Sequence, residues 1–132
     1  MPDFHRFETH WLARIGTVDL CVEVQNGKAQ PVLLDLADSI VNNLDHYKSM
    51  GTRYLDRFVD RQNASGNPET EWWLDQVDIF QTTDGKAPVF ALSYSLDGDD
   101  GGWWTVKVRS FDHSDHPLEK GQIPFAFSRD QG

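Results

Sequence analysis

The sequence predicts one α+β domain over residues 1–132, in which an antiparallel sheet of about five or six strands packs on one long helix in the order ββ-α-βββ(β). Two patterns predict this class. Segments near both ends alternate apolar and polar residues, as half-buried strands do, whereas residues 31–62 carry an apolar stripe at steps of three and four. A chain of 132 residues is long enough to bury a core without disulfides or metals.

The first third of the chain predicts two strands. Residues 4–12 are rich in aromatics and are interpreted as a strand, although their spacing is mixed. Residues 17–25 are clearer, because four apolar positions alternate with polar ones: Val18, Leu20, Val22 and Val24. Asn26 and Gly27 are typical turn residues and end this second strand.

The middle of the chain predicts the helix. Pro31 suits a first helical turn, and Asp35 lies near the positive end of the helix dipole. Gly51 would ordinarily favour a break, but the apolar stripe stays in phase through it. We therefore expect one long helix, straight or mildly kinked, in which Gly51 lets the sheet approach closely, over two helices joined by a loop.

The last part predicts three or four strands. After loop residues 63–68, residues 71–80 return to an extended pattern. Residues 89–96 and 103–109 predict a β-hairpin with an acidic, glycine-rich tip at 97–102. Residues 123–127 contain Pro124, which is tolerated in an edge strand.

A binding surface follows from this layout, because one helix covers only one face of a sheet. Neighbouring strand residues point to opposite faces, so each tryptophan pair should place one indole on the uncovered face. Aromatic anchors ringed by carboxylates suit the capture of a basic protein surface. The candidate partner-binding residues are Asp19, Glu23, Trp73, Asp97, Asp99, Asp100 and Trp103.

Charge and composition limit the class of binding partner and the cellular compartment that we expect. A formal net charge of -9 repels nucleic acid and anionic lipid and favours a cationic partner, although acidity that serves only solubility is the alternative. Cys21 is the single cysteine, which excludes an intrachain disulfide and fits a reducing cytoplasm. We find no secretory leader and no apolar run long enough to span a bilayer, so we expect no membrane association.

Signals for chemistry are weak. Common nucleophile, phosphate-binding and zinc motifs are missing, and Asp19 and Glu23 would raise the pKa of Cys21 and suppress its thiolate. The 97–102 tip lacks the ligand spacing of a calcium loop. His113 and His116 lie in a polar connection that resembles an ordinary exposed loop more than a metal site. We therefore expect no catalytic residues, no metal and no cofactor.

Several runs carry a resemblance: residues 54–58 (YLDRF), 71–75 (EWWLD), 92–100 (LSYSLDGDD) and 104–106 (WTV). Over about residues 15–110 the chain resembles small acidic bacterial domains of unknown function with a ββ-α-βββ order, similar to toxin-immunity families. The likeness is one of hydrophobic pattern and turns, so it transfers no site residue. What it implies is a binding role of the immunity type.

The leading hypothesis is therefore a non-enzymatic, cytoplasmic protein that occludes a basic toxin or nuclease. One alternative is a small-molecule or metal-binding, enzyme-like domain with a pocket between helix and sheet and with His113, His116 or the acidic tip at its mouth. The other is a structural homodimer that covers the outward tryptophans.

Overall fold

A seven-stranded mixed sheet dominates the computed structural model, which describes residues 2–83, 86–99, 102–111 and 121–130. The strands are β1 (His5–Arg6), β2 (His10–Ile15), β3 (Val18–Glu23), β4 (Trp72–Ile79), β5 (Val89–Leu96), β6 (Trp103–Phe111) and β7 (Gly121–Asp130). They lie side by side in sequence order. Three helices, α1 (Pro31–Asn42), α2 (Leu44–Asp56) and α3 (Arg61–Ser65), connect β3 to β4.

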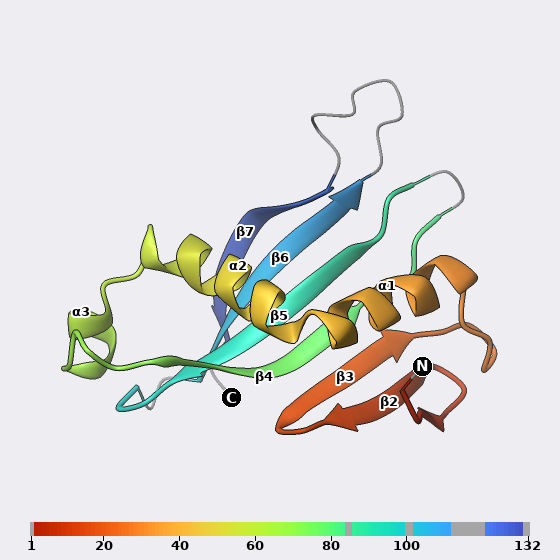
Figure 1. The fold of residues 1–132 in the computed structure, drawn as a ribbon, viewed down its shortest axis with the longest axis horizontal. Coiled ribbons are helices and arrows are strands. Elements are labelled where there is room, and N and C mark those ends of the chain that lie inside the picture. The colour runs from red at the N-terminus through yellow and green to blue at the C-terminus, as the bar shows by residue number, and fades with distance from the viewer. Residues whose placement is uncertain (1, 84–85, 100–101, 112–120, 131–132) are drawn as a thin grey trace.

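The connection through the helices makes one strand pair parallel. β3 and β4 run in the same direction, with Asp19 opposite Gln76 and Cys21 opposite Asp78, while every other neighbouring pair is antiparallel. A parallel pair needs a long crossover, which the three helices supply. In Figure 1, α1 and α2 follow one another across one face of the sheet, and α3 lies beyond the far end of α2.

The predicted fold class is therefore wrong in two respects. The sheet is mixed and has seven strands, where an antiparallel sheet of five or six was predicted, and it packs on separate helices in place of one long helix. The helix breaks at Asn43, whose backbone angles of φ -138° and ψ 38° are not helical. The Asn43 side-chain amide donates to the carbonyl of Ser39, 2.8 Å away, which favours the local turn over a continuing helix. The apolar stripe stays in phase because α1 and α2 cover the same sheet face.

The Gly51 interpretation, in contrast, is confirmed. α2 continues through Gly51, and a Cβ atom built there would lie 2.1 Å from the hydroxyl oxygen of Tyr94 on β5. Tyr94 is fully buried and donates a hydrogen bond to the carbonyl of Lys48 at 2.9 Å. The missing side chain thus allows the helix to rest directly on the sheet.

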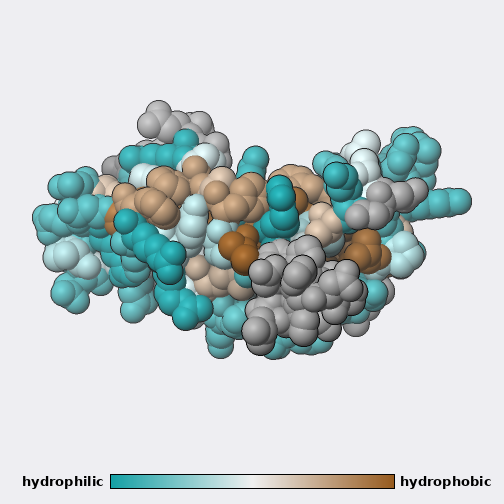
Figure 2. Space-filling model, turned by 90° about the horizontal axis from the view of Figure 1, so that it is seen from above, coloured by the Kyte–Doolittle hydropathy of each residue, from teal (hydrophilic) through white to brown (hydrophobic). Residues whose placement is uncertain are grey.

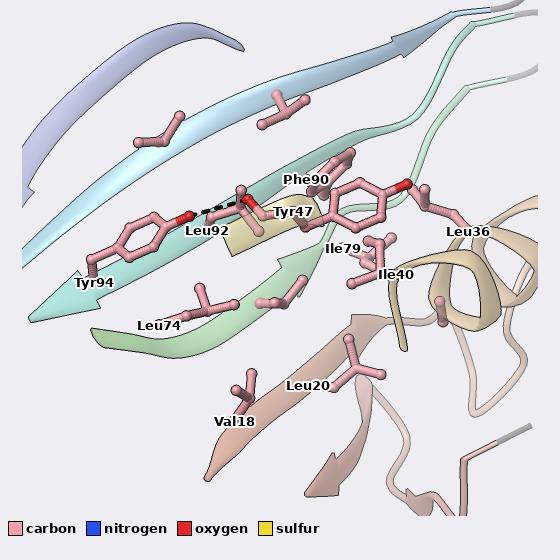
Figure 3. Close-up of a cluster of buried hydrophobic side chains, with 14 of the residues drawn as sticks. Val18, Leu20, Leu36, Ile40, Tyr47, Leu74, Ile79, Phe90, Leu92 and Tyr94 are labelled. Atoms are coloured by element: carbon pink, nitrogen blue, oxygen red, sulfur yellow. Dashed lines mark hydrogen bonds between the residues drawn. The ribbon is translucent and has the colours of Figure 1, made fainter. Parts of the chain in front are cut away.

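The core fills the space between the helices and the sheet (Figure 3). Leu36, Ile40 and Tyr47 from the helices meet Ile79, Phe90 and Leu92 from the central strands, among other buried residues. The tryptophan pairs split as predicted: Trp72 and Trp104 are 2% and 9% exposed and belong to this core. Their neighbours Trp73 and Trp103 are 49% and 46% exposed.

The two ends of the sheet differ. At one end, the predicted strand over residues 4–12 is divided into the two-residue β1 and the longer β2. At the other, β7 lies at the edge, as the proline of its sequence predicts. Seen from above (Figure 2), hydrophobic side chains form a band between two hydrophilic ends, so the surface of this acidic chain is not uniformly hydrophilic.

Candidate functional site

The face of the sheet turned away from the helices, called the open face below, holds the candidate site. Strand alternation defines it, because each strand buries every second residue against the helices. Its central residues are Asp19, Cys21 and Glu23 on β3, Trp73, Gln76 and Asp78 on β4, Ala91, Ser93 and Ser95 on β5, and Trp103, Thr105, Lys107 and Arg109 on β6.

A groove of about 780 Å³ crosses the open face over β2, β3 and β4. Carboxylates of Asp19, Glu23 and Asp78 line it together with the amide of Gln76. Apolar walls come from Leu12 and Phe80, and the Cys21 thiol lies among them. The groove therefore combines negative charge with apolar contact surface, and it lies on the opposite face from any pocket between helix and sheet.

Asp78 is the most enclosed carboxylate of the groove. Partial burial raises its pKa, although hydrogen bonds from Gln76 and Cys21 act in the opposite direction. The Gln76 amide donates to both carboxylate oxygens, at 2.9 and 3.1 Å. The surroundings of Asp78 solvate its carboxylate poorly, so a cation bound beside it would stabilise the ionised form.

Cys21 is not a nucleophile at neutral pH. Burial, reinforced by the charge and hydrogen bond of Asp78 and by the charge of Glu23, raises its pKa to about 11. The sequence predicted this direction, but it named Asp19 beside Glu23 rather than Asp78. The thiol therefore serves as a neutral lining of the groove.

The other two carboxylates are anchored loosely. Asp19 forms an exposed ion pair with Arg14 across the β2–β3 hairpin at 3.0 Å. Glu23 accepts a hydrogen bond from the backbone N–H of Gln81 at 3.1 Å. An exposed ion pair contributes about 0 to 1 kcal/mol, so Asp19 can exchange Arg14 for another cation at little cost.

A second hollow of about 250 Å³ adjoins the groove and is lined by Gln76, Ser93, Trp103 and Thr105. Since Gln76 lines both hollows, the acidic groove and the Trp103 indole belong to one continuous surface. Trp73 lies at the margin of that surface, where β4 has no β3 neighbour. The ammonium nitrogen of Lys48 on α2 is 5.8 Å from the centroid of its ring.

The acidic tip of the β5–β6 hairpin does not join this surface as a unit. Asp97 is exposed, but the Asp99 side chain is only 3% exposed. Its carboxylate accepts a hydrogen bond from the Trp104 indole at 2.8 Å and pairs with Arg129 on β7. Asp99 thus holds the hairpin to β7. Asp100 lies outside the described residues.

Sequence reasoning missed Gln76, Asp78, Lys107 and Arg109. A bulge at Asp75 shifts the pairing between Leu74 and Gln76, so counting in twos from Trp73 points to the wrong residues. Buried Val77 and Ile79 were the available signal, since apolar alternation restarts there. The parallel pairing that sets Asp78 beside Cys21 left no trace in either strand's own sequence.

The described residues contain neither a metal-binding cluster nor a membrane-spanning helix. No group of three or more His, Cys, Asp or Glu side chains there is placed to hold a metal ion, and His113 and His116 lie outside that part of the chain. None of the described helices is long and apolar enough to cross a membrane. Comparison with known proteins gave no match to a family model, a curated protein or a solved structure.

Proposed function

We propose that this chain is a non-enzymatic, acidic binding domain that captures a basic protein on its open face, acting in the cytoplasm as an immunity protein that occludes a toxin or nuclease. The observation that carries the proposal is the continuity of the acidic groove with the exposed Trp103 indole through Gln76. Charge for attraction and an aromatic anchor for affinity thus occur on one surface.

Each component has a separate physical role. A net charge of -9 speeds the approach of a cationic partner, and the groove carboxylates orient it. Trp103 supplies apolar surface that a partner can bury at little entropic cost, as tryptophans at interface hot spots typically do. A partner that covers the open face would have its own basic surface blocked, so inhibition is by occlusion.

Two matched variants distinguish the contribution of the groove carboxylates to binding from that of acidic residues elsewhere on the surface. The groove variant Asp19→Asn/Glu23→Gln/Asp78→Asn removes three negative charges but keeps side-chain size, and the raised pKa of Asp78 makes a neutral residue acceptable there. The control Asp35→Asn/Asp45→Asn/Glu69→Gln removes three charges from exposed positions off the open face.

The experiment is affinity capture from the native host, followed by kinetics with the basic protein recovered. We expect the groove variant to bind at least about tenfold more weakly, equivalent to about 1.4 kcal/mol, and the control to bind like the wild type. Association should also slow as salt is raised, because screening weakens steering. Equal affinity of both variants for the captured protein would overturn the proposal.

A further inference from the structure

The open face carries negative charge on one side of its central strand, β5, and positive charge on the other. Carboxylates of Asp19, Glu23 and Asp78 lie on the β3–β4 side, whereas Lys107 and Arg109 lie on β6. β5 between them presents small side chains to the same face: Ala91, Ser93 and Ser95. The face therefore has an acidic half, a basic half and a shallow line between them.

The strand register arranges β4, β5 and β6 in four rows across this face. One row is Asp78, Ala91 and Lys107, and the next is Gln76, Ser93 and Thr105. On one side of them, Trp73 is opposite Ser95, and Trp103 directly precedes the partner of Tyr94. On the other, Phe80 bonds to Val89, which is opposite Arg109.

We propose that a second copy of this chain docks on the open face, sheet against sheet, about a two-fold axis that runs along β5. Rotation about that axis keeps each row in place and exchanges β4 with β6. Asp78 then faces Lys107 of the second copy, Trp73 faces Trp103, Gln76 faces Thr105, and Phe80 faces Arg109. Every row meets a chemically complementary one, twice per dimer.

The occupant follows from charge and shape together. Lys107 of each copy neutralises the Asp78 carboxylate of the other, so two chains of net charge -9 meet through oppositely charged halves. Small side chains on β5 permit the close approach that aligned sheets adopt, at about 10 Å and within about 30°. The contact also covers Trp73 and Trp103, which are otherwise about half exposed.

Self-association does not depend on the proposed capture of a basic protein, but it uses the same groove. Lys107 and Arg109 of the second copy occupy the place that the cationic partner would take, so the two bound states exclude each other. Because the dimer forms from the purified chain alone, its measurement is independent of whether any partner is found.

Sedimentation equilibrium of the purified full chain tests the dimer by charge exchange. Asp78→Lys sets two lysines against each other at both symmetry-related contacts of this row, and Lys107→Asp does the same with two carboxylates. We expect each variant alone to dimerise at least about tenfold more weakly than the wild type. An equimolar mixture of the two should recover a dimer, since a lysine faces an aspartate at both contacts of the mixed dimer.

A control substitution distinguishes the loss of the Asp78–Lys107 contact from the effect of a changed net charge. Lys28→Asp changes the charge by the same amount as Lys107→Asp at an exposed turn off the open face, and it should leave dimerisation unchanged. A wild-type chain that stays monomeric, variants that dimerise like the wild type, or a mixture no better than its components would each overturn the proposal.

Discussion

Gly51 marks the closest approach between the helix layer and the sheet. The space that a side chain would need is taken by the Tyr94 ring and hydroxyl, which lie 2.1 to 2.7 Å from where a Cβ atom would be. Tyr94 is anchored by a hydrogen bond to the Lys48 carbonyl and is fully buried, so it cannot simply move aside. One missing methyl group therefore fixes the spacing of two layers.

We predict that Gly51→Ala lowers the free energy of unfolding by about 2 kcal/mol, because overpacking costs more than the gain in helix propensity returns. Urea denaturation measures the loss. Ser49→Ala, at an exposed position two residues away on α2, should change stability by less than about 0.5 kcal/mol. Equal stabilities of the two variants would show that the sheet yields to the added methyl group.

Asp56 joins three elements at the other end of α2. Its carboxylate accepts hydrogen bonds from Arg61 at 2.6 and 2.9 Å and from the Trp72 indole at 2.9 Å. Partial burial alone would raise the pKa of Asp56, but the bonds from Arg61 and Trp72 outweigh it and lower the pKa from its usual 3.8. The ionised form is therefore favoured in the folded chain.

The lowered pKa predicts a pH dependence. Stability from Asp56 is fully present above the usual pKa of 3.8, which the unfolded chain has, and is lost as the pH falls through the lower folded pKa. Asp56→Asn should be less stable than the wild type by about 1 kcal/mol at pH 7. Urea unfolding at pH 7 and pH 3 should show this difference shrinking in acid, and a constant difference would contradict the ionic role of Asp56.

At the scale of elements, the β5–β6 hairpin depends on the one tip carboxylate that turns inward. Asp99→Asn keeps an acceptor for Trp104 but removes the charge that pairs with Arg129. We predict a loss of about 2 kcal/mol in the free energy of unfolding, because hydrogen bonds to charged groups are the strong ones. Asp97→Asn, at an exposed position in the same turn, should stay within about 0.5 kcal/mol of the wild type.

Strand positions were the most predictable part of the fold, because period-two alternation is local. It located β3 to within two residues and pointed to one outward indole in each tryptophan pair. The break at Asn43 could not be read from the stripe, since two helices on the same sheet face keep one phase. The parallel β3–β4 pair depends on where the crossover returns the chain, which no single segment specifies.

The candidate site was predictable to the same extent. Asp19, Glu23, Trp73 and Trp103 follow from alternation and lie on the open face. Asp78 required the bulge at Asp75, and the inward turn of Asp99 required the return of β7 with Arg129. Long-range pairing thus decided which carboxylates line the groove and which one stabilises the fold.

At the scale of the whole molecule, the helices cover one face of the sheet and leave the other to make contacts. In the proposed binding role, the chain's excess of carboxylates would attract a basic partner at long range, and the groove beside Trp103 would contact it at short range. The open face is thus the surface on which both the basic partner and the second copy are proposed to bind.

The five tryptophans allow that claim to be tested directly. Indole N–H groups of Trp11, Trp72 and Trp104 donate to Gly27, Asp56 and Asp99 inside the fold, whereas Trp73 and Trp103 are about half exposed on the open face. The decisive measurement is the ¹⁵N–¹H spectrum of the indole groups as the captured basic protein is added. If the partner binds to the open face, the Trp73 and Trp103 signals will shift while the other three stay in place; shifts confined to Trp11, Trp72 or Trp104 would contradict this binding surface.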